Sequence, residues 1–217
     1  KRIPGDKDYK ANRKNAGAQI RGAGLIAGGK KMKVALIQME IAEKNTPGNI
    51  AHGLELLQEA AVGSDIAVLP EIWTTGYSLG HLEEEAETID GSTVTAVRKI
   101  ANDHHCAVVA GSIPLRHKDG KIYNNTVVID KQGSIVASYS KVHLFGLFNE
   151  ERFFAAGDNF DTYELNGVIC GSTICYDLRF PELYRHLSFL CLLNGRLPGA
   201  IFGLCWPRPA ARKTIII

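Results

Sequence analysis

Residues 171–185 read G-S-T-I-C-Y-D-L-R-F-P-E-L-Y-R, and this stretch decides how the rest of the chain is interpreted. An apolar run over residues 168–175 ends at Cys175, which predicts a buried strand that finishes on a thiol. Pro181 then opens a second segment, and proline is tolerated in the first turn of a helix. Taken alone, a cysteine at the end of a buried strand is usually a small core residue.

Two other segments place a charged side chain after a predicted strand. L-P-E-I-W-T-T-G-Y carries Glu71, and Y-S-K-V-H-L-F carries Lys141. Alone, each is typical of a solvated surface residue. Together with Cys175, however, they supply a base, a cation and a nucleophile. A thiol is mostly protonated near neutral pH and needs a base, which a carboxylate supplies. An ammonium lowers the energy of the thiolate and can hold an oxyanion, so the set suits attack of sulfur on a carbon bonded to nitrogen.

The pattern around these segments alternates strands with helices and then continues in hairpins. Apolar runs predict strands over residues 34–39, 65–69, 106–113, 123–129, 134–140, 161–165 and 168–175. Three helices are predicted. The first has Thr46 as its N-cap and Pro47 at its first helical position, and the other two cover residues 92–102 and 181–190. The turns D-K-Q-G and N-G predict two hairpins. This order implies a mixed α/β fold with helices on at least one face of a sheet.

Charge divides the chain into three parts. Residues 1–31 carry nine Lys and Arg against two Asp, and residues 191–217 carry four basic side chains and no acid. The middle holds 12 basic and 21 acidic side chains, a net charge of −9, which argues against nucleic acid as a partner. Residues 1–31 show no sustained periodicity, so we predict a disordered basic extension and a native start at Met32.

The number of cysteines and the lengths of the apolar runs indicate the cellular compartment in which the protein is expected. The five cysteines are an odd number and form no C-x-x-C pair, which argues against a disulfide framework or a zinc site. No apolar run reaches the ~18 residues that a membrane-spanning helix needs. We therefore expect a cytoplasmic protein with no membrane partner and no metal.

The three segments, in this order and with this spacing, resemble the nitrilase family of carbon–nitrogen hydrolases. The resemblance covers residues 32–190 and is most specific in C-Y-D-L-R-F-P-E-L-Y-R. It implies an α-β-β-α sandwich, and it implies Glu71 as general base, Lys141 as transition-state stabiliser and Cys175 as nucleophile. It also implies that the reaction needs no metal or organic cofactor.

The resemblance implies supporting residues as well. The family has a second glutamate shortly after its lysine, and Glu150 in F-N-E-E-R is the expected match, with Glu151 as the competing assignment. The backbone N–H of Tyr176 is expected to hold the oxyanion together with the lysine. Tyr77 and Phe145 either line the substrate pocket or only fill the core.

The sequence from Lys141 to residue 158 looks like that of amidases acting on small linear ω-amides, such as those of 2-oxo or dicarboxylic acids. Such substrates carry a carboxylate, and Arg179 is a candidate partner for it by bidentate pairing. The competing interpretation of Arg179 is a structural salt bridge with Asp177 or Glu182. Hydrolysis of a nitrile by the same triad is the alternative reaction.

The regular pattern stops after residue 190, although the family fold requires a further core strand, a helix and final strands. Residues 191–217 show no clean period, and only Trp206, Pro207 and Arg212 faintly resemble an expected W-P-x-x-R segment. We therefore expect a truncated or frameshifted tail and a fold that is incomplete at this end. Missing strands would leave sheet edges unpaired, so a catalytically inactive fragment is one alternative. A module that binds through the pocket or the basic ends without catalysis is another. A complete domain is expected to form a homodimer or a larger homo-oligomer.

Overall fold

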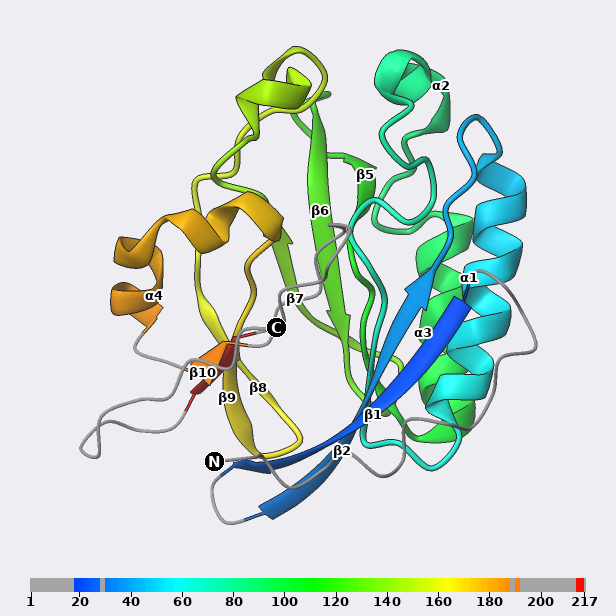
Figure 1. Ribbon diagram of the computed structural model, residues 1–217, viewed down its shortest axis with the longest axis vertical. Helices are drawn as coiled ribbons and strands as arrows, with labels where there is room; N and C mark the ends of the chain where they lie inside the picture. The colour runs from blue at the N-terminus through cyan, green and yellow to red at the C-terminus, as the bar shows by residue number, and fades with distance from the viewer. Residues whose placement is uncertain (1–17, 28–29, 188–189, 192–213, 217) are drawn as a thin grey trace, which may run out of the picture.

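The computed structural model describes residues 18–27, 30–187, 190–191 and 214–216, which form two β-sheets and their covering helices (Figure 1). The larger sheet has the order β1-β2-β3-β4-β6-β5, with β7 paired to β6. Its strands are β1 (Ala18–Ala27), β2 (Lys30–Met39), β3 (Ile66–Val68), β4 (Ala107–Val109), β5 (Ile113–Arg116), β6 (Ile122–Ile129) and β7 (Ile135–Ser140). The smaller sheet has the order β10-β11-β9-β8, with strands β8 (Thr162–Leu165), β9 (Val168–Gly171), β10 (Leu190–Cys191) and β11 (Thr214–Ile216). The mixed α/β class predicted from the sequence is confirmed.

The helical segments lie between these strands. The α-helices are α1 (Thr46–Ala61), α2 (Leu82–Glu85), α3 (Ser92–His104) and α4 (Pro181–Leu187), and the short 3-10 turns are η1 (Leu79–His81), η2 (Gly146–Phe148), η3 (Glu150–Arg152) and η4 (Cys175–Arg179). The prediction that Thr46 is the N-cap of α1 was wrong. The N-cap of α1 is Asn45, whose side chain accepts a hydrogen bond from the backbone N–H of Gly48, while the Thr46 hydroxyl donates to Glu85 instead. An Asn satisfies a free helical N–H as well as a Thr does.

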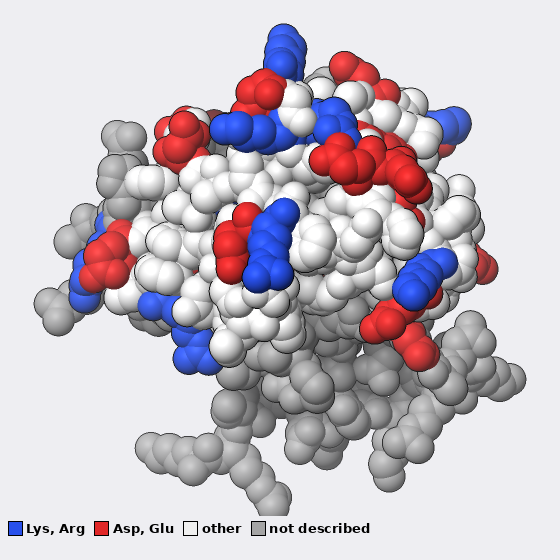
Figure 2. Space-filling model, turned by 90° about the horizontal axis from the view of Figure 1, so that it is seen from above, with Lys and Arg blue, Asp and Glu red and all other residues white. Residues whose placement is uncertain are grey.

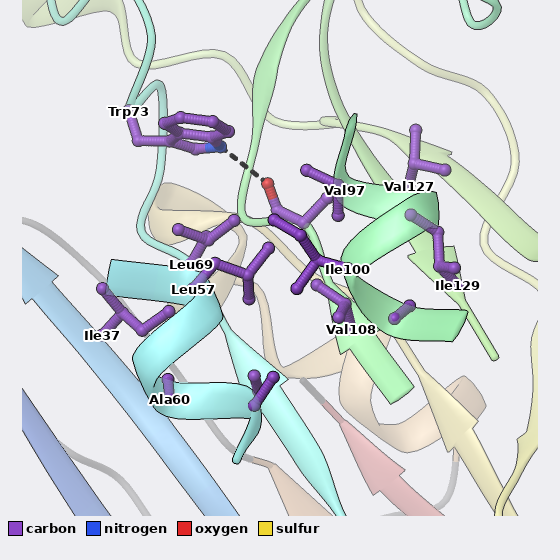
Figure 3. Packing of buried hydrophobic residues seen from close by; sticks show 14 of the residues in the cluster. Ile37, Leu57, Ala60, Leu69, Trp73, Val97, Ile100, Val108, Val127 and Ile129 are labelled. Atoms are coloured by element: carbon purple, nitrogen blue, oxygen red, sulfur yellow. Dashed lines mark hydrogen bonds between the residues drawn. The ribbon is translucent and has the colours of Figure 1, made fainter. Parts of the chain in front are cut away.

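Each face of the larger sheet is covered by a different layer. Helices α1 and α3 pack on one face, around Leu57, Val97 and Ile129 (Figures 1 and 3). The other face packs against β8 and β9 through a second buried cluster that includes Val68 and Cys170. The larger sheet is therefore buried on both sides, and its central strands β3 and β4 are apolar throughout, as strands covered on both faces are.

The N-terminal prediction was partly wrong. Residues 18–27, expected as part of a disordered extension, form β1, which pairs antiparallel with β2 from Ala18 opposite Met39 to Ala27 opposite Lys30. A strand rich in Gly and Ala has no apolar alternation, so its sequence carries no periodic signal. Residues 1–17 lie outside the described part of the chain.

The C-terminal part of the chain contributes two short strands to the smaller sheet. Two short pieces, β10 and β11, pair in parallel with each other, and β11 also pairs in parallel with β9. The strand-like run at residues 200–202, and the segment with Trp206, Pro207 and Arg212, lie outside the described residues. Within the described residues, the smaller sheet therefore consists of β8, β9 and these two short strands.

The predicted strand over residues 106–113 is divided in two by a sharp turn. β4 ends at Val109, Gly111 has a φ of +60°, and β5 begins at Ile113. A Cβ added to Gly111 would overlap the carbonyl oxygen of Pro70, so the two backbones can approach closely only at a glycine. This turn therefore supports the segment that leads from β3 to Glu71.

Replacing Gly111 by alanine is expected to lower the free energy of unfolding by about 3 kcal/mol or more, because it adds a backbone clash to an unfavourable φ. Gly120 is the matched control. It also has a positive φ, of +83°, but a Cβ there meets nothing within 4 Å. Gly120→Ala should therefore cost only the conformational term, about 1–2 kcal/mol. Urea denaturation of both variants measures the difference, and equal losses would contradict the proposed role of the close approach.

Candidate functional site

Three strand ends meet at one end of the molecule. Glu71 follows β3, Lys141 directly follows β7, and Cys175 follows β9 at the start of η4. β3 is parallel to β2, so both strands end on the same side of the sheet. In Figure 1 the β2 arrow points toward this side, and the chain also leaves β9 for η4 there. The Lys141 Nζ donates to the Oε1 of Glu71 at 2.9 Å, so residues distant in sequence are in direct contact.

The segment that carries Glu71 is fixed by the core beneath it. The backbone N–H of Ile72 donates to the Ser112 hydroxyl at 3.0 Å. The indole Nε1 of the fully buried Trp73 donates to the carbonyl of Ala110 at 2.8 Å, as the dashed line in Figure 3 shows. Because these bonds lie on either side of the turn at Gly111, Glu71 sits on a rigid support.

Lys141 is buried completely between two carboxylates. Its Nζ lies 2.9 Å from Glu71 and 3.0 Å from Glu150, and all three side chains are removed from solvent. Burial alone would lower the pKa of Lys141, but the negative charges of Glu71 and Glu150 outweigh it and raise that pKa. The lysine is therefore held as an ammonium, as a buried charge requires paired partners.

Glu71 receives three hydrogen bonds. Its Oε1 accepts from Lys141 and, at 3.1 Å, from the Nδ2 of Asn124, while its Oε2 accepts from the hydroxyl of Tyr77 at 2.9 Å. Burial, followed by the charge of Glu71, raises the pKa of Tyr77, which keeps this hydroxyl a donor. The carboxylate is thus held in one orientation by donors on both oxygens.

Cys175 is partly exposed and has a φ of +46°, an uncommon value for a residue that is not glycine. Burial, and then the adjacent charge of Glu71, raises the pKa of its thiol to about 12, although Lys141 opposes the shift. The thiol is therefore protonated at neutral pH and lies beside a carboxylate that can take its proton.

This raised pKa leads to a spectroscopic prediction. The ultraviolet difference spectrum between the wild type and Cys175→Ser should show no thiolate absorbance step between about pH 6 and about pH 9, because the Cys175 thiol stays protonated there. Cysteines elsewhere in the chain cancel in this difference. A titration step near neutral pH would contradict the prediction and would indicate a preformed thiolate paired with Lys141.

The structure distinguishes the two adjacent glutamates. Glu150 is fully buried and bound to Lys141, and its Oε2 accepts from the backbone N–H of Phe145 at 2.8 Å. Glu151, the competing assignment, is exposed. Burial raises the pKa of Glu150 even though Lys141 opposes the shift.

A buried aspartate connects the cysteine segment to the lysine segment. Asp177 accepts from the Tyr139 hydroxyl at 2.6 Å, from the backbone N–H of His143 at 3.0 Å and from the backbone N–H of Ile174 at 2.9 Å. The ring Nδ1 of His143 lies 2.8 Å from the same carboxylate. Asp177 was not among the site residues predicted from the sequence, although its position two residues after Cys175 could have indicated such a role.

Aromatic rings surround the site. Phe145 contacts both Phe148 and Tyr176, and Phe148 contacts Tyr77. Of the two residues expected to line a pocket or fill the core, Tyr77 binds Glu71 through its hydroxyl, and Phe145 holds Glu150 through its backbone and lies in this aromatic group. Phe148 is half-exposed, so the aromatic group reaches the surface.

Arg179 is exposed and makes neither of the two salt bridges considered from the sequence. Asp177 is fully buried and bound to Tyr139 and His143, and Glu182 pairs with Arg185 at 2.8 Å. Figure 2 views the molecule from the end at which η2 and η3 lie, and charged side chains of both signs are scattered there in small groups.

The described residues contain neither a metal-binding cluster nor a membrane-spanning helix. Within them, no group of three or more His, Cys, Asp or Glu side chains is arranged to hold a metal ion. Nor is any helix in the described ranges long and apolar enough to cross a bilayer.

Comparison with known proteins gives one consistent family. The carbon–nitrogen hydrolase family profile matches residues 33–189. The chain is 37% identical to the 2-oxoglutaramate amidase of Bacillus subtilis over 155 residues, covering 71% of the chain and 60% of that protein. It is 33% identical to the omega-amidase NIT2 of Homo sapiens over 159 residues, covering 70% of the chain and 57% of that protein.

Among solved structures, the fold is similar to that of a CN-hydrolase superfamily protein from Xanthomonas campestris, which carries an arsenic adduct in its active site. The TM-score is 0.67 and the identity 29%, and the match covers 77% of the chain and 65% of that protein. The chain thus spans about 60% of the length of the curated relatives that it matches.

Proposed function

The chain belongs to the carbon–nitrogen hydrolase family, and we propose that it hydrolyses the C–N bond of a small linear amide, releasing ammonia. The observation that carries this proposal is the buried ammonium of Lys141 between Glu71 and Glu150, with the Cys175 thiol beside Glu71. These are the base, cation and nucleophile that attack on an amide carbon requires.

In the first half of the reaction, the sulfur of Cys175 bonds to the amide carbon while Glu71 accepts the thiol proton. The carbonyl oxygen becomes an oxyanion, which Lys141 and the backbone N–H of Tyr176 stabilise. The C–N bond then breaks, and the nitrogen takes the proton and leaves as ammonia. Glu150, whose pKa burial raises, assists this transfer or positions the amide.

In the second half, Glu71 takes a proton from water, and the hydroxide attacks the thioester carbon. The C–S bond breaks, and the sulfur recovers a proton as the carboxylic acid leaves. The net change consumes one amide and one water and produces one acid and one ammonia. Glu71 acts as base in both halves, and its three fixed hydrogen bonds suit a group that must return to the same position.

The proposed substrate class is the ω-amide of a 2-oxo or dicarboxylic acid. The names of two relatives, a 2-oxoglutaramate amidase and an omega-amidase, support this class. Arg179 is the proposed partner of the substrate carboxylate, since it is exposed and free of the two salt bridges expected for a structural role. The aromatic group around Phe145 would contact the carbon chain.

The test is ammonia release from 2-oxoglutaramate, from an uncharged amide of similar length, and from the corresponding nitrile. The proposal expects turnover of the ω-amide, slower turnover of the uncharged amide and little from the nitrile. Arg179→Met should raise KM for the ω-amide only. A folded protein that releases ammonia from none of the three would refute the proposed activity, and preference for the nitrile would assign nitrile hydrolysis instead.

A further inference from the structure

Asn124 contacts two members of the triad, although no step of the proposed reaction uses it. It lies on β6 and is fully buried. Its side-chain Nδ2 donates to the Oε1 of Glu71 at 3.1 Å, and its backbone carbonyl accepts from the N–H of Lys141 at 2.9 Å. One residue thereby fixes both the carboxylate and the start of the lysine segment.

The pairing of β6 with β7 explains this placement. Asn125 pairs with Ser140, so the residue before Asn125 faces the residue after Ser140, which is Lys141. Successive side chains on a strand point to opposite faces. The Asn125 amide accordingly bonds to Ser138 and Ser140 on the other face, away from Glu71.

Packing alone does not account for an amide at position 124. The second polar atom of this side chain, Oδ1, is buried and has no hydrogen-bond partner among the described residues. A buried acceptor without a partner costs free energy, which an apolar side chain of similar size would avoid. The hydrogen bond from Nδ2 to Glu71 is the favourable polar contact of the Asn124 side chain. We therefore attribute the amide at this position to its interaction with the Glu71 carboxylate.

We propose that Asn124 is a positioning residue that holds the Glu71 carboxylate in the orientation needed to take a proton from Cys175. Asn124 and Lys141 both donate to Oε1, and Tyr77 donates to Oε2, so the carboxylate cannot rotate without breaking a bond. An amide suits this role because it adds a donor without adding charge. The site keeps one ammonium between two carboxylates, a balance that an Asp or a Lys at this position would change.

This inference rests on the proposed amidase function, and the neighbouring residue supplies its control. Asn124→Ala and Asn125→Ala remove the same atoms from adjacent, buried positions of one strand, but only the first breaks a bond to Glu71. We expect Asn124→Ala to lower kcat for the ω-amide by about 10- to 100-fold, with KM changed by less than about twofold, because the base is misplaced and the substrate contacts remain. Asn125→Ala should leave kcat within about threefold at a temperature at which both variants are folded.

The separation of kcat from KM distinguishes positioning from general destabilisation. Lys141, Glu150, Tyr77 and Cys175 surround Glu71, and both variants retain all four side chains. A general loss of stability would lower the activity of both variants alike, whereas a misplaced Glu71 carboxylate lowers kcat in Asn124→Ala alone. Equal kcat values in the two variants would overturn the inference.

A second readout does not depend on turnover. Alkylation of Cys175 by iodoacetamide requires loss of the thiol proton, which Glu71 accepts, and mass spectrometry of the peptide that contains Cys175 measures its rate. At about pH 6, Asn124→Ala should react several-fold more slowly than Asn125→Ala. If the wild type hydrolyses no amide, the proposed function fails, and this rate alone decides the role of Asn124. Equal rates would overturn the inference.

Discussion

Replacing Cys175 by alanine is expected to lower kcat for ammonia release by at least about 10⁴-fold, because the thioester can no longer form. The buried Cys106 and Cys170 cannot substitute, since Cys106 lies in the core beneath α1 and α3 and Cys170 lies in the buried cluster between the two sheets. Glu71 and Lys141 would remain, and they alone would support only the small residual rate of a binding site with an oxyanion donor. An assay of ammonia release at a saturating concentration of the amide measures this loss of kcat.

The control for this change is Cys170→Ala, five residues earlier on β9. Cys170 is fully buried in the cluster between the two sheets, so its loss should reduce stability by about 1 kcal/mol and leave kcat unchanged. Mass spectrometry of the wild type mixed with substrate should also show an acyl adduct on Cys175 that the Cys175→Ala variant lacks. If Cys175→Ala kept more than about a tenth of the wild-type kcat, the thiol would not be the nucleophile.

The sequence predicted the hairpins and the helices α1 and α3 because their signals are local. The helix predicted over residues 181–190 is observed only over Pro181–Leu187, and Leu190 lies in β10. N-G at residues 166–167 joins β8 to β9 as expected, and D-K-Q-G at residues 130–133 joins β6 to β7. Glu71, Lys141 and Cys175 could be grouped because each follows a strand within a recognisable segment. What brings them together is the packing of two sheets, which no local pattern encodes.

The contacts missed by the sequence analysis depend on strand register and on long-range packing. Asn124 and Asn125 are indistinguishable in sequence, yet one bonds to Glu71 and the other to Ser140. Only the register of β6 against β7 separates them. The division of residues 106–113 at Gly111 likewise depends on the backbone of Pro70, which is far away in sequence.

Replacing Lys141 by methionine should affect stability as well as activity. The methionine would leave the buried carboxylates of Glu71 and Glu150 facing each other without a cation. Removing one partner of a buried ion network leaves uncompensated charge, so we expect the free energy of unfolding at neutral pH to fall by about 3–5 kcal/mol. Loss of the oxyanion donor should lower kcat by about 10²–10³-fold or more. Urea denaturation and ammonia assay measure the two effects.

The stability loss of Lys141→Met should depend on pH in a definite direction. Burial already raises the pKa of Glu150 in the wild type, and removing Lys141 removes the main group that opposes this rise. A carboxyl whose pKa is higher in the folded state binds its proton more tightly there, so the loss is smallest at low pH. The loss grows as pH rises above the ordinary pKa at which Glu150 ionises in the unfolded chain, and it stops growing above the higher pKa at which Glu150 ionises in the folded state. A loss that did not vary with pH would contradict the buried-charge explanation.

Two further variants separate charge from packing at this position. Lys99→Met removes an exposed lysine that pairs with Asp103, and it should cost no more than about 0.5 kcal/mol. Lys141→Met combined with Glu150→Gln removes one carboxylate together with the ammonium, so it should recover part of the stability and none of the activity. Recovery of stability without activity would mean that the fold tolerates a neutral core here and that the chemistry requires the cation. If the double variant were less stable than Lys141→Met, packing around the Lys141 side chain, and not its charge, would be what stabilises this end of the sandwich.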